Sequence, residues 1–305
     1  MNSYELIYDF KENKHYNNEL YNIIKKSPKS YFEDWMLKGH WDENYYPIAL
    51  INEKNDIVAA VCIIRLNLSI NEVKCNAIQV GRIFIRDGYE KDEVDKKLLN
   101  LVAEKYSNVS DLIYSFSDSE TDALFYNSEF QKIQEFIYYI PWNSSFETEK
   151  TAIKKLDTDS VKDIEFIQDH IKHATKTPSV IASNGDSSVK LYNILKFYRR
   201  NVYYISEIDA VVVFTINQVK KRFTLVAIYS SNKIDIMDLL KILVPDGIER
   251  IEFMFIPNLS CGVNIRRLSF IETPEGNVPS YLYMKEITTA LAGKRIFFPV
   301  LGRGK

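Results

Sequence analysis

The sequence predicts a protein of the α+β class, with a mixed α/β sheet covered by helices on both faces. Ile57–Leu68 is rich in β-branched residues and follows a polar turn at 52–56, which is typical of a strand. The apolar spacing changes from strand-like to helical at about Lys91, and Leu112–Phe116 is a short apolar run of the kind found in buried strands. Antiparallel strands are therefore expected to lead into a β-α-β crossover.

The elements before this segment follow the same periodicities. A strand is expected at 4–9, helices at 16–26 and 29–38, and a further strand at 46–51. The apolar residues at helical spacing in the second of these helices are Tyr31, Phe32, Trp35 and Met36. Two helices are thus expected between the first strand and the hairpin.

The elements after the hairpin complete the first half. Val73–Ile85 alternates and then becomes fully apolar, which predicts a long strand. The helix that follows it has one apolar face, formed by Val94, Leu98, Leu99, Val102 and Tyr106. After the strand at 112–116, we expect a short helix at 119–128 and a last strand at 130–140.

A polar, aperiodic stretch after Pro141 predicts a domain boundary. Residues 1–142 are expected to form one domain, 143–159 a linker, and 160–305 a second α/β domain. In the second domain we expect helices at 160–172, 189–199 and 234–243, a loop at 174–188, and strands at 202–206, 210–216, 222–229, 250–256, 280–284 and 296–301. The similar element content suggests two related folds in tandem, although no residue-level repeat is visible.

Composition excludes several classes of function. The 305 residues contain 39 basic and 41 acidic side chains, interspersed, for a net charge of −2. This balance argues against a nucleic-acid or membrane-surface partner. The N-terminus lacks the basic region and apolar core of a secretory signal, and no apolar run approaches the roughly 20 residues that span a bilayer. We therefore expect a cytoplasmic protein.

The sequence offers little for a metal site. Three cysteines are too few and too scattered for a disulfide framework or a metal-ligand pattern. His170 and His173 lie one turn apart on a predicted helix, so they form either a ligand pair or part of a solvated helix face. Since no cysteine or further histidine stands at ligand spacing, the solvated face is favoured and no metal is expected.

Three stretches carry a family resemblance. Tyr46–Val61 has the outline of a hairpin, Ala77–Leu99 that of a strand, loop and helix, and Leu112–Phe130 that of a last strand and helix. Together they resemble the GNAT (GCN5-related N-acetyltransferase) superfamily. Asn201–Asp209 and Phe297–Leu301 are similar to the C-terminal half of a bacterial tandem-GNAT group. The resemblance implies a GNAT-like N-terminal domain followed by a second GNAT-like α/β domain.

The resemblance also implies a chemistry, which is direct transfer of an acyl group from acetyl-CoA to an amine. Backbone N–H groups of Ile83, Phe84 and Ile85 would polarise the thioester carbonyl and bind the pantetheine arm. The turn and helix N-terminus would bind the pyrophosphate, because unpaired amides favour an anion there. The residues implied for that contact are Lys91, Asp92, Glu93, Val94, Asp95 and Lys96.

This loop departs from the family's usual arginine or glutamine followed by glycines. Glu90, Glu93 and Asp95 occupy those positions when the alignment is fixed on Lys96–Leu99. Two like charges about 4 Å apart cost roughly 1 kcal/mol in water and roughly 4 kcal/mol at an effective dielectric of about 20. Carboxylates at a helix N-terminus are also stabilising caps. The segment is therefore either a degenerate phosphate loop or a capped helix start.

The candidate acid and base are less well marked. The family's tyrosine, which often protonates the departing thiolate, aligns with Phe125, and Tyr126 stands beside it. Tyr126 is thus a candidate general acid, or else a buried or surface tyrosine. Asp118 occupies a position where the family usually has asparagine. In the loop before the second strand, Glu43 or Asp42 is a candidate general base, the alternative being a polar loop.

Two functions remain open from the sequence. The first is a cytoplasmic tandem-GNAT N-acetyltransferase, with a degenerate phosphate loop, that uses acetyl-CoA to modify a small-molecule or peptide amine. The second is a GNAT-fold binding or scaffold protein that has lost acyl-CoA affinity. The acceptor amine stays unidentified, because acceptor sites are built from variable loops.

Overall fold

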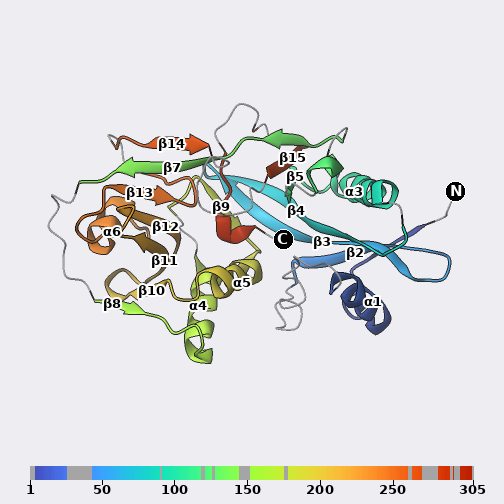
Figure 1. The fold of residues 1–305 in the computed structure, drawn as a ribbon, viewed down its shortest axis with the longest axis horizontal. Coiled ribbons are helices and arrows are strands. Elements are labelled where there is room, and N and C mark those ends of the chain that lie inside the picture. Colours follow the sequence, from blue (N-terminus) through green and yellow to red (C-terminus); the bar gives the residue numbers. More distant parts are fainter. Residues whose placement is uncertain are drawn as a thin grey trace.

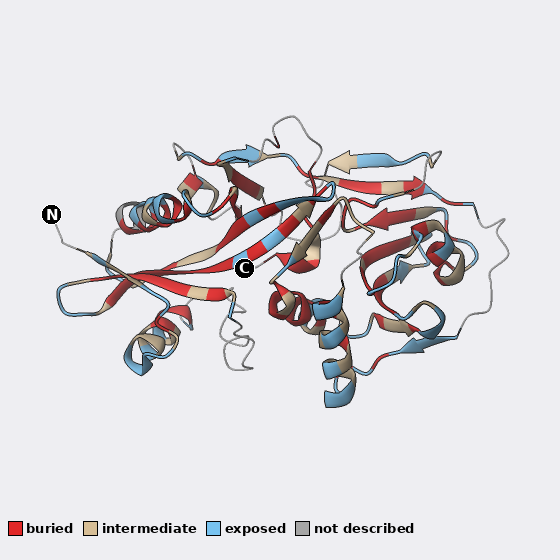
Figure 2. Cartoon of the chain, turned by 180° about the vertical axis from the view of Figure 1, so that it is seen from behind, coloured by how far each residue is buried: buried red, intermediate tan, exposed pale blue. Residues whose placement is uncertain are grey.

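Two mixed sheets with helices on their faces make up the chain (Figure 1). The computed structural model describes residues 4–25, 43–89, 91–117, 121–125, 128–143, 152–174, 178–259, 263–269, 281–288, 291 and 296–303, with only the backbone of 91–93. The predicted helix at 29–38 lies outside the described residues. The central strands of both sheets are buried, whereas edge strands and several helices carry exposed residues (Figure 2).

The first sheet has eight strands. Their order is β1 (Glu5–Tyr8), β2 (Tyr45–Ile51), β3 (Ile57–Ile70), β4 (Val73–Ile85), β5 (Leu112–Ser117), β15 (Tyr281–Glu286) and β6 (Gln131–Ile133), with β9 (Ile181–Asn184) paired to the end of β3. The β4–β5 pair is parallel, and the other pairs are antiparallel. The predicted antiparallel strands and β-α-β crossover are therefore present.

The second sheet repeats this plan with seven strands. Their order is β14 (Arg266–Ser269), β7 (Phe136–Pro141), β13 (Arg250–Phe253), β12 (Arg222–Tyr229), β11 (Ala210–Asn217), β10 (Val202–Ile205) and β8 (Ile153–Lys155). One pair, β12–β13, is parallel, and the others are antiparallel.

The helices lie on both faces of the sheets. They are α1 (Lys14–Ile24), α3 (Lys91–Tyr106), α4 (Val161–His173), α5 (Ser187–Phe197) and α6 (Ile236–Leu243). On the first sheet, Leu98 of α3 shares a buried cluster with Ile63, whereas Leu20 of α1 shares another with Cys62. Because neighbouring strand residues point to opposite faces, α1 and α3 cover opposite sides of β3.

The two sheets exchange strands. β7 follows β6 directly in the chain, yet β7 pairs with β13 of the second sheet while β6 stays in the first. In return, β15 from the C-terminal half pairs with β5 and β6. The predicted strand at 130–140 is therefore divided between two sheets. The division into 1–142, 143–159 and 160–305 stays a prediction, since each sheet takes a strand from the other segment.

A buried ion pair marks the point where the chain crosses from β6 to β7. Glu135 and Arg303 are 4% and 5% exposed, and the Arg303 guanidinium lies 2.8 Å from the Glu135 carboxylate. Glu135 also accepts the Phe298 amide, and Arg303 donates to the Phe298 carbonyl. The pair thus ties the C-terminal segment to the strand crossing.

Two sequence predictions are wrong in this region. Residues 296–301 form no strand: Ile296 makes a single bridge to Glu135, and the segment ends in the 3-10 helix η4 (Val300–Gly302). The predicted loop at 174–188 contains β9 and the start of α5. Of the predicted helix at 119–128, the described part is the 3-10 helix η1 (Asp122–Phe125).

Candidate functional site

The parallel pair β4–β5 opens into a wedge. The two strands are paired from Ala77 to Val80, and the pairing ends opposite Ser115. Beyond that point β4 continues to Ile85 beside β3. We call the space between β4 after Val80 and β5 after Ser115 the first wedge. The resemblance described above implies a binding site at this position, near Ile83–Ile85.

A β-bulge starts the first wedge. Val80 lies opposite Ile63 and Ile83 lies opposite Val61, so Gly81 and Arg82 together face Cys62. A β carbon at Gly81 would lie 2.8 Å from the Cys62 carbonyl oxygen, so the position requires glycine. Burial raises the pKa of the Cys62 thiol to about 12, so this thiol stays protonated and is no nucleophile at neutral pH.

The bulge directs backbone groups into the first wedge. The Arg86 amide donates to the Val58 carbonyl at 2.9 Å, and antiparallel hydrogen bonding alternates along the strand. The backbone of Phe84 therefore faces β3, while the N–H and C=O groups of Ile83 and Ile85 face the wedge. Of the three predicted donors, the register places two at the open edge and turns Phe84 away from it.

The start of α3 lies beside this edge. Val94 is buried in the core with Leu98, so its side chain contributes to packing. Asp95 is 4% exposed, and its Oδ1 accepts the Lys96 amide at 2.9 Å. Lys96 itself is exposed. Lys96 is the sixth residue of α3, beyond the four helix-start amides that lack an acceptor within the helix, so this contact between neighbouring residues is not an N-cap.

The turn between β4 and α3 is tied to neighbouring elements. Gly88 has a φ of 90°, which suits the turn from Arg86 to Tyr89. The Arg86 guanidinium pairs with Glu19 of α1, and Asn52 donates to the Tyr89 hydroxyl at 3.0 Å. The side chains of Lys91, Asp92 and Glu93, and all of Glu90, lie outside the described residues.

An aromatic stack lies at the end of β5. Phe125 is buried, and its ring is stacked on that of Tyr283, with centroids 4.3 Å apart. The Tyr283 hydroxyl donates to Asp122, which also pairs with Lys132 at 3.1 Å. Sequence reasoning missed Tyr283, because its place follows from the pairing of β15 with β5. The candidate acid Tyr126 lies outside the described residues, as do Asp118 and Asp42.

The candidate base lies toward the other end of β4. Glu43 is exposed and stands two residues before Tyr45, which lies opposite Ile64 and hence in line with Gln79. The first wedge opens in the opposite direction, from Gly81 onward. The structure thus gathers Ile83, Ile85, Val94, Asp95 and Lys96 near one end of β4 and places Glu43 toward the other.

The two histidines of α4 have carboxylate neighbours. His170 Nε2 lies 3.2 Å from Asp209, and His173 Nδ1 lies 3.0 Å from Asp169. Hydrogen bonds from His170 and Tyr204 lower the pKa of Asp209. Among the described residues, no group of three or more His, Cys, Asp or Glu side chains is arranged to hold a metal ion.

The second sheet contains a second wedge of the same construction. β12 and β13 are paired in parallel from Arg222 to Leu225, and the pairing ends opposite Phe253. One residue further, Val226 is the extra residue of a bulge against β11. We call the space between β12 after Leu225 and β13 after Phe253 the second wedge. Both sheets therefore place a bulge directly after the last parallel pair.

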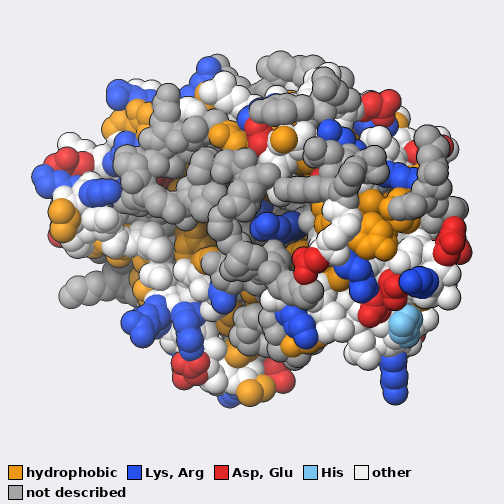
Figure 3. All heavy atoms as spheres, turned by 45° about the vertical axis from the view of Figure 1, so that its right-hand side comes forward, with side chains coloured by type: hydrophobic (Ala, Val, Ile, Leu, Met, Phe, Trp, Pro, Cys, Tyr) orange, Lys and Arg blue, Asp and Glu red, His pale blue; other side chains and the backbone are white. Residues whose placement is uncertain are grey.

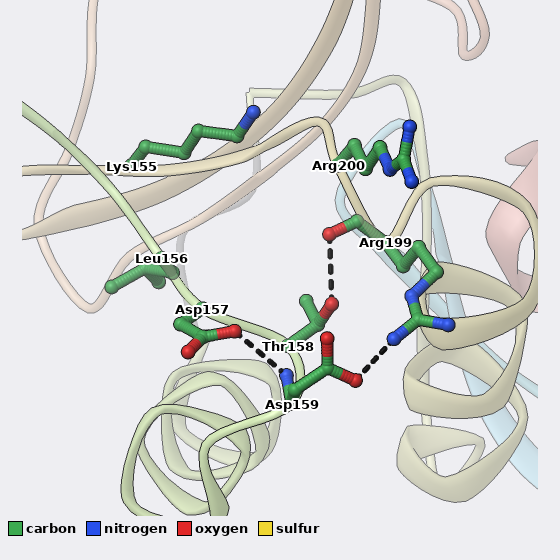
Figure 4. Close-up of a pocket in the computed structure, with 7 residues that line it drawn as sticks. All are labelled: Lys155, Leu156, Asp157, Thr158, Asp159, Arg199 and Arg200. Atoms are coloured by element: carbon green, nitrogen blue, oxygen red, sulfur yellow. Dashed lines mark hydrogen bonds and ion pairs between the residues drawn. The ribbon is translucent and has the colours of Figure 1, made fainter.

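A surface pocket lies near the start of α4 (Figure 4). It has a volume of about 410 Å³ and includes Lys155, Asp157 and Arg200. Some of its polar groups pair with one another: Arg199 pairs with Asp159, and the Thr158 hydroxyl donates to the Arg199 carbonyl at 2.8 Å. The pocket therefore carries no ligand-specific arrangement of groups.

Two observations describe the charge of one face and the character of the helices. Basic and acidic side chains are interspersed on the face shown in Figure 3. None of the helices in the described part of the chain has the length and apolar character that a membrane crossing requires.

Comparison with known proteins identifies the fold. No family model matches the sequence, and no curated protein matches it. Solved structures do match. Eis1 from Mycobacterium abscessus has a TM-score of 0.54 at 9% identity, over 94% of this chain and 74% of Eis1. A GCN5-related N-acetyltransferase from Kribbella flavida has a TM-score of 0.53 at 12% identity, over 94% and 72% of the two chains.

A third match agrees with these two. A GCN5-related N-acetyltransferase from Anabaena variabilis has a TM-score of 0.53 at 9% identity, over 93% of this chain and 73% of that one. The chain therefore has the GNAT fold, with a GNAT-like N-terminal domain followed by a second GNAT-like α/β domain. The predicted fold class is confirmed.

Proposed function

We propose that this chain is an acyl-CoA-dependent N-acetyltransferase that transfers an acetyl group to a small-molecule or peptide amine. One observation carries the proposal. The bulge at Gly81 ends the β4–β5 pairing and turns the backbone groups of Ile83 and Ile85 into the first wedge. The names of the matching structures, which are N-acetyltransferases, agree with it. The cytoplasm, where the sequence predicts the protein, would supply acetyl-CoA.

The first wedge fits the acyl-pantetheine part of the donor. An extended pantetheine arm carries two amides, which can pair with an open strand edge as another strand would. An N–H group at Ile83 or Ile85 that meets the thioester oxygen would stabilise the oxyanion formed when the amine attacks the carbonyl carbon. The attack forms the C–N bond, and the collapse of the intermediate restores the carbonyl, breaks the C–S bond and releases the coenzyme thiolate. The proton that the amine nitrogen loses balances the one that the thiolate takes up.

The fit is poorer at the pyrophosphate end. The start of α3 offers a helix dipole and the cation of Lys96, but it also carries the buried Asp95 carboxylate, whose negative charge opposes a pyrophosphate. We expect the coenzyme to bind weakly for this reason. Lys91, Asp92 and Glu93 stay proposed contacts, as do Tyr126 as general acid and Glu43 as general base.

The alternative function is a GNAT-fold binding or scaffold protein. Two observations favour it: Asp95 acts against a pyrophosphate, and Phe125, which cannot donate a proton, is packed against Tyr283. An inactive protein would keep the fold and bind no acyl-CoA.

Calorimetric titration with acetyl-CoA separates the two functions. We expect saturable heat in the micromolar to millimolar range for the wild type and none for Gly81→Val, which would block the bulge. Absence of heat from the wild type at millimolar acetyl-CoA would contradict the enzymatic proposal. Release of free coenzyme thiol with a panel of small amines and peptides then tests turnover, and unchanged kcat/KM in Tyr126→Phe or Glu43→Gln removes that residue from the mechanism.

A further inference from the structure

The second wedge contains a segment of the chain itself. Met254, the first residue after β13, donates its amide to the Leu225 carbonyl at 2.9 Å, which continues the parallel pairing by one residue. Its carbonyl oxygen accepts the Val300 amide at 3.2 Å. The first residue of η4 is therefore hydrogen-bonded to β13 where this strand leaves β12.

Side chains fill the remaining space. Leu301 is buried and shares a core cluster with Val226 and Tyr229 of β12. A cavity of about 40 Å³ remains beside Pro299 and Leu301. Such a volume holds about one water molecule, and a pantetheine arm is many times larger.

The segment is held in place on its other side. Asn193 of α5 donates to the Leu301 and Arg303 carbonyls at 2.8 and 3.1 Å. Arg303 in turn forms the buried ion pair with Glu135. Figure 1 shows the C-terminal segment between the two sheets, beside α5. Residues 299–301 are thus an ordered part of the core.

The helix start next to the second wedge is also satisfied internally. The Asp235 carboxylate caps α6 and accepts the Met237 and Asp238 amides at 2.7 and 3.3 Å. These are the amides that a phosphate at this helix N-terminus would need. In the second sheet, the wedge that would take a pantetheine arm and the helix start that would take a phosphate are therefore both occupied by groups of the chain.

The first wedge differs in this respect. The residue of β5 that corresponds to Met254 is Phe116, the first after the last parallel pair. Within the described part of the chain, the backbone hydrogen bonds outside helices and strands include none to Phe116, and none to Ile83 or Ile85. We infer that residues 299–301 close the second wedge, so that each chain has one acyl-CoA site, in the first wedge, instead of two. The number of sites rests on the proposed function, whereas the closure of the second wedge does not.

Hydrogen exchange tests the closure without any ligand. Val300→Pro removes the amide that Met254 accepts, and proline fits this position because it opens η4 and follows a residue with a ψ of 128°. Val300→Ala is the matched control, since it shortens the side chain and keeps the amide. We expect several-fold faster deuterium uptake in peptides covering 225–229 and 253–256 for Val300→Pro, and wild-type uptake for Val300→Ala. Equal uptake in the two variants would overturn the closure.

Native mass spectrometry of the wild type with acetyl-CoA counts the sites. One coenzyme per chain at saturation supports the inference, and two would overturn it. If no coenzyme binds, the single site fails together with the proposed function, while the exchange experiment still decides whether the second wedge is closed.

Discussion

Gly81 lies so close to Cys62 that a β carbon at position 81 would stand 2.8 Å from the Cys62 carbonyl oxygen. This contact exists because Gly81 is part of the bulge that ends the β4–β5 pairing. A side chain there can be accommodated only if the backbone of β3 or β4 moves. The geometry of the first wedge therefore depends on the absence of a side chain at one position.

Gly81→Ala is expected to lower both stability and acetyl-CoA binding. Relief of the contact with Cys62 should reduce the free energy of unfolding by about 1–3 kcal/mol, as overpacking in a core does. Urea unfolding and calorimetric titration measure the two effects. Gly247→Ala is the control: Gly247 has a φ of 82° but no neighbour within 4 Å of the added carbon, so this variant strains the backbone without altering the wedge. Wild-type binding by Gly81→Ala would contradict the role of the bulge.

Asp95→Asn is expected to strengthen acetyl-CoA binding. The variant keeps the shape of the side chain and removes a negative charge from the start of α3, where two like charges about 4 Å apart cost at least about 1 kcal/mol. The dissociation constant should fall by at least about fivefold. Glu104→Gln, an exposed site near the other end of α3, removes the same charge and should leave binding unchanged. If both variants bind acetyl-CoA more tightly to the same extent, the effect comes from the net charge of the protein and not from the position of Asp95.

Asp111 should contribute stability that is lost in acid. Hydrogen bonds from the Thr288 hydroxyl and then the Asn76 amide lower the pKa of Asp111 below 3.8. Because the folded pKa is the lower one, the contribution is complete well above pH 3.8 and disappears as the pH falls through the folded value. Asp111→Asn should therefore lower the free energy of unfolding by at most about 1 kcal/mol at pH 7, because the group is partly exposed. At pH 3 the variant should lower it by less.

Denaturant titrations of the wild type and Asp111→Asn at both pH values measure this difference. Asp246→Asn, at an exposed position in the turn between α6 and β13, is the charge-matched control. If Asp111→Asn destabilises the protein more at pH 3 than at pH 7, the pKa of Asp111 is not lowered by folding.

Removing one partner of the Glu135–Arg303 ion pair should destabilise the fold strongly, whereas replacing both residues with apolar ones should destabilise it little. Glu135→Gln leaves the buried guanidinium without its counter-charge, so the free energy of unfolding should fall by about 3–5 kcal/mol. The double variant Glu135→Met/Arg303→Leu removes both charges and should recover most of that loss. Urea unfolding of the single and double variants measures the coupling. Additive losses in the double variant would show that the two residues act independently.

The sequence predicts local structure here better than long-range pairing. The change of period near Lys91 locates α3, and the apolar runs locate β3, β4 and β5, because burial on a helix or strand imposes those periods. The division of 130–140 leaves no comparable trace. No glycine or proline interrupts Phe130–Ile140, and Glu135, where the chain crosses, follows the equally polar Gln131, Lys132 and Gln134, so that it does not stand out.

The residues of the candidate site differ in the same way, since some have a local signal in the sequence and others depend on long-range pairing. An isolated glycine in an apolar strand indicates a bulge, so Gly81 had a local signal that could have been used. Tyr283 had none, because its contact with Phe125 depends on the pairing of strands far apart in the sequence. The hydrogen bond from Val300 to Met254 likewise depends on where the C-terminal segment crosses the second sheet.

The exchange of β7 and β15 has a consequence for biosynthesis. A ribosome makes the chain from its N-terminus, so β1 to β6 emerge long before β15, which pairs between β5 and β6. Until Tyr281–Glu286 have left the ribosome, the edges of β5 and β6 have no partner strand, and exposed edges of this kind are aggregation-prone. The N-terminal half thus cannot mature ahead of the rest, and completion of its sheet waits for almost the whole chain to be translated.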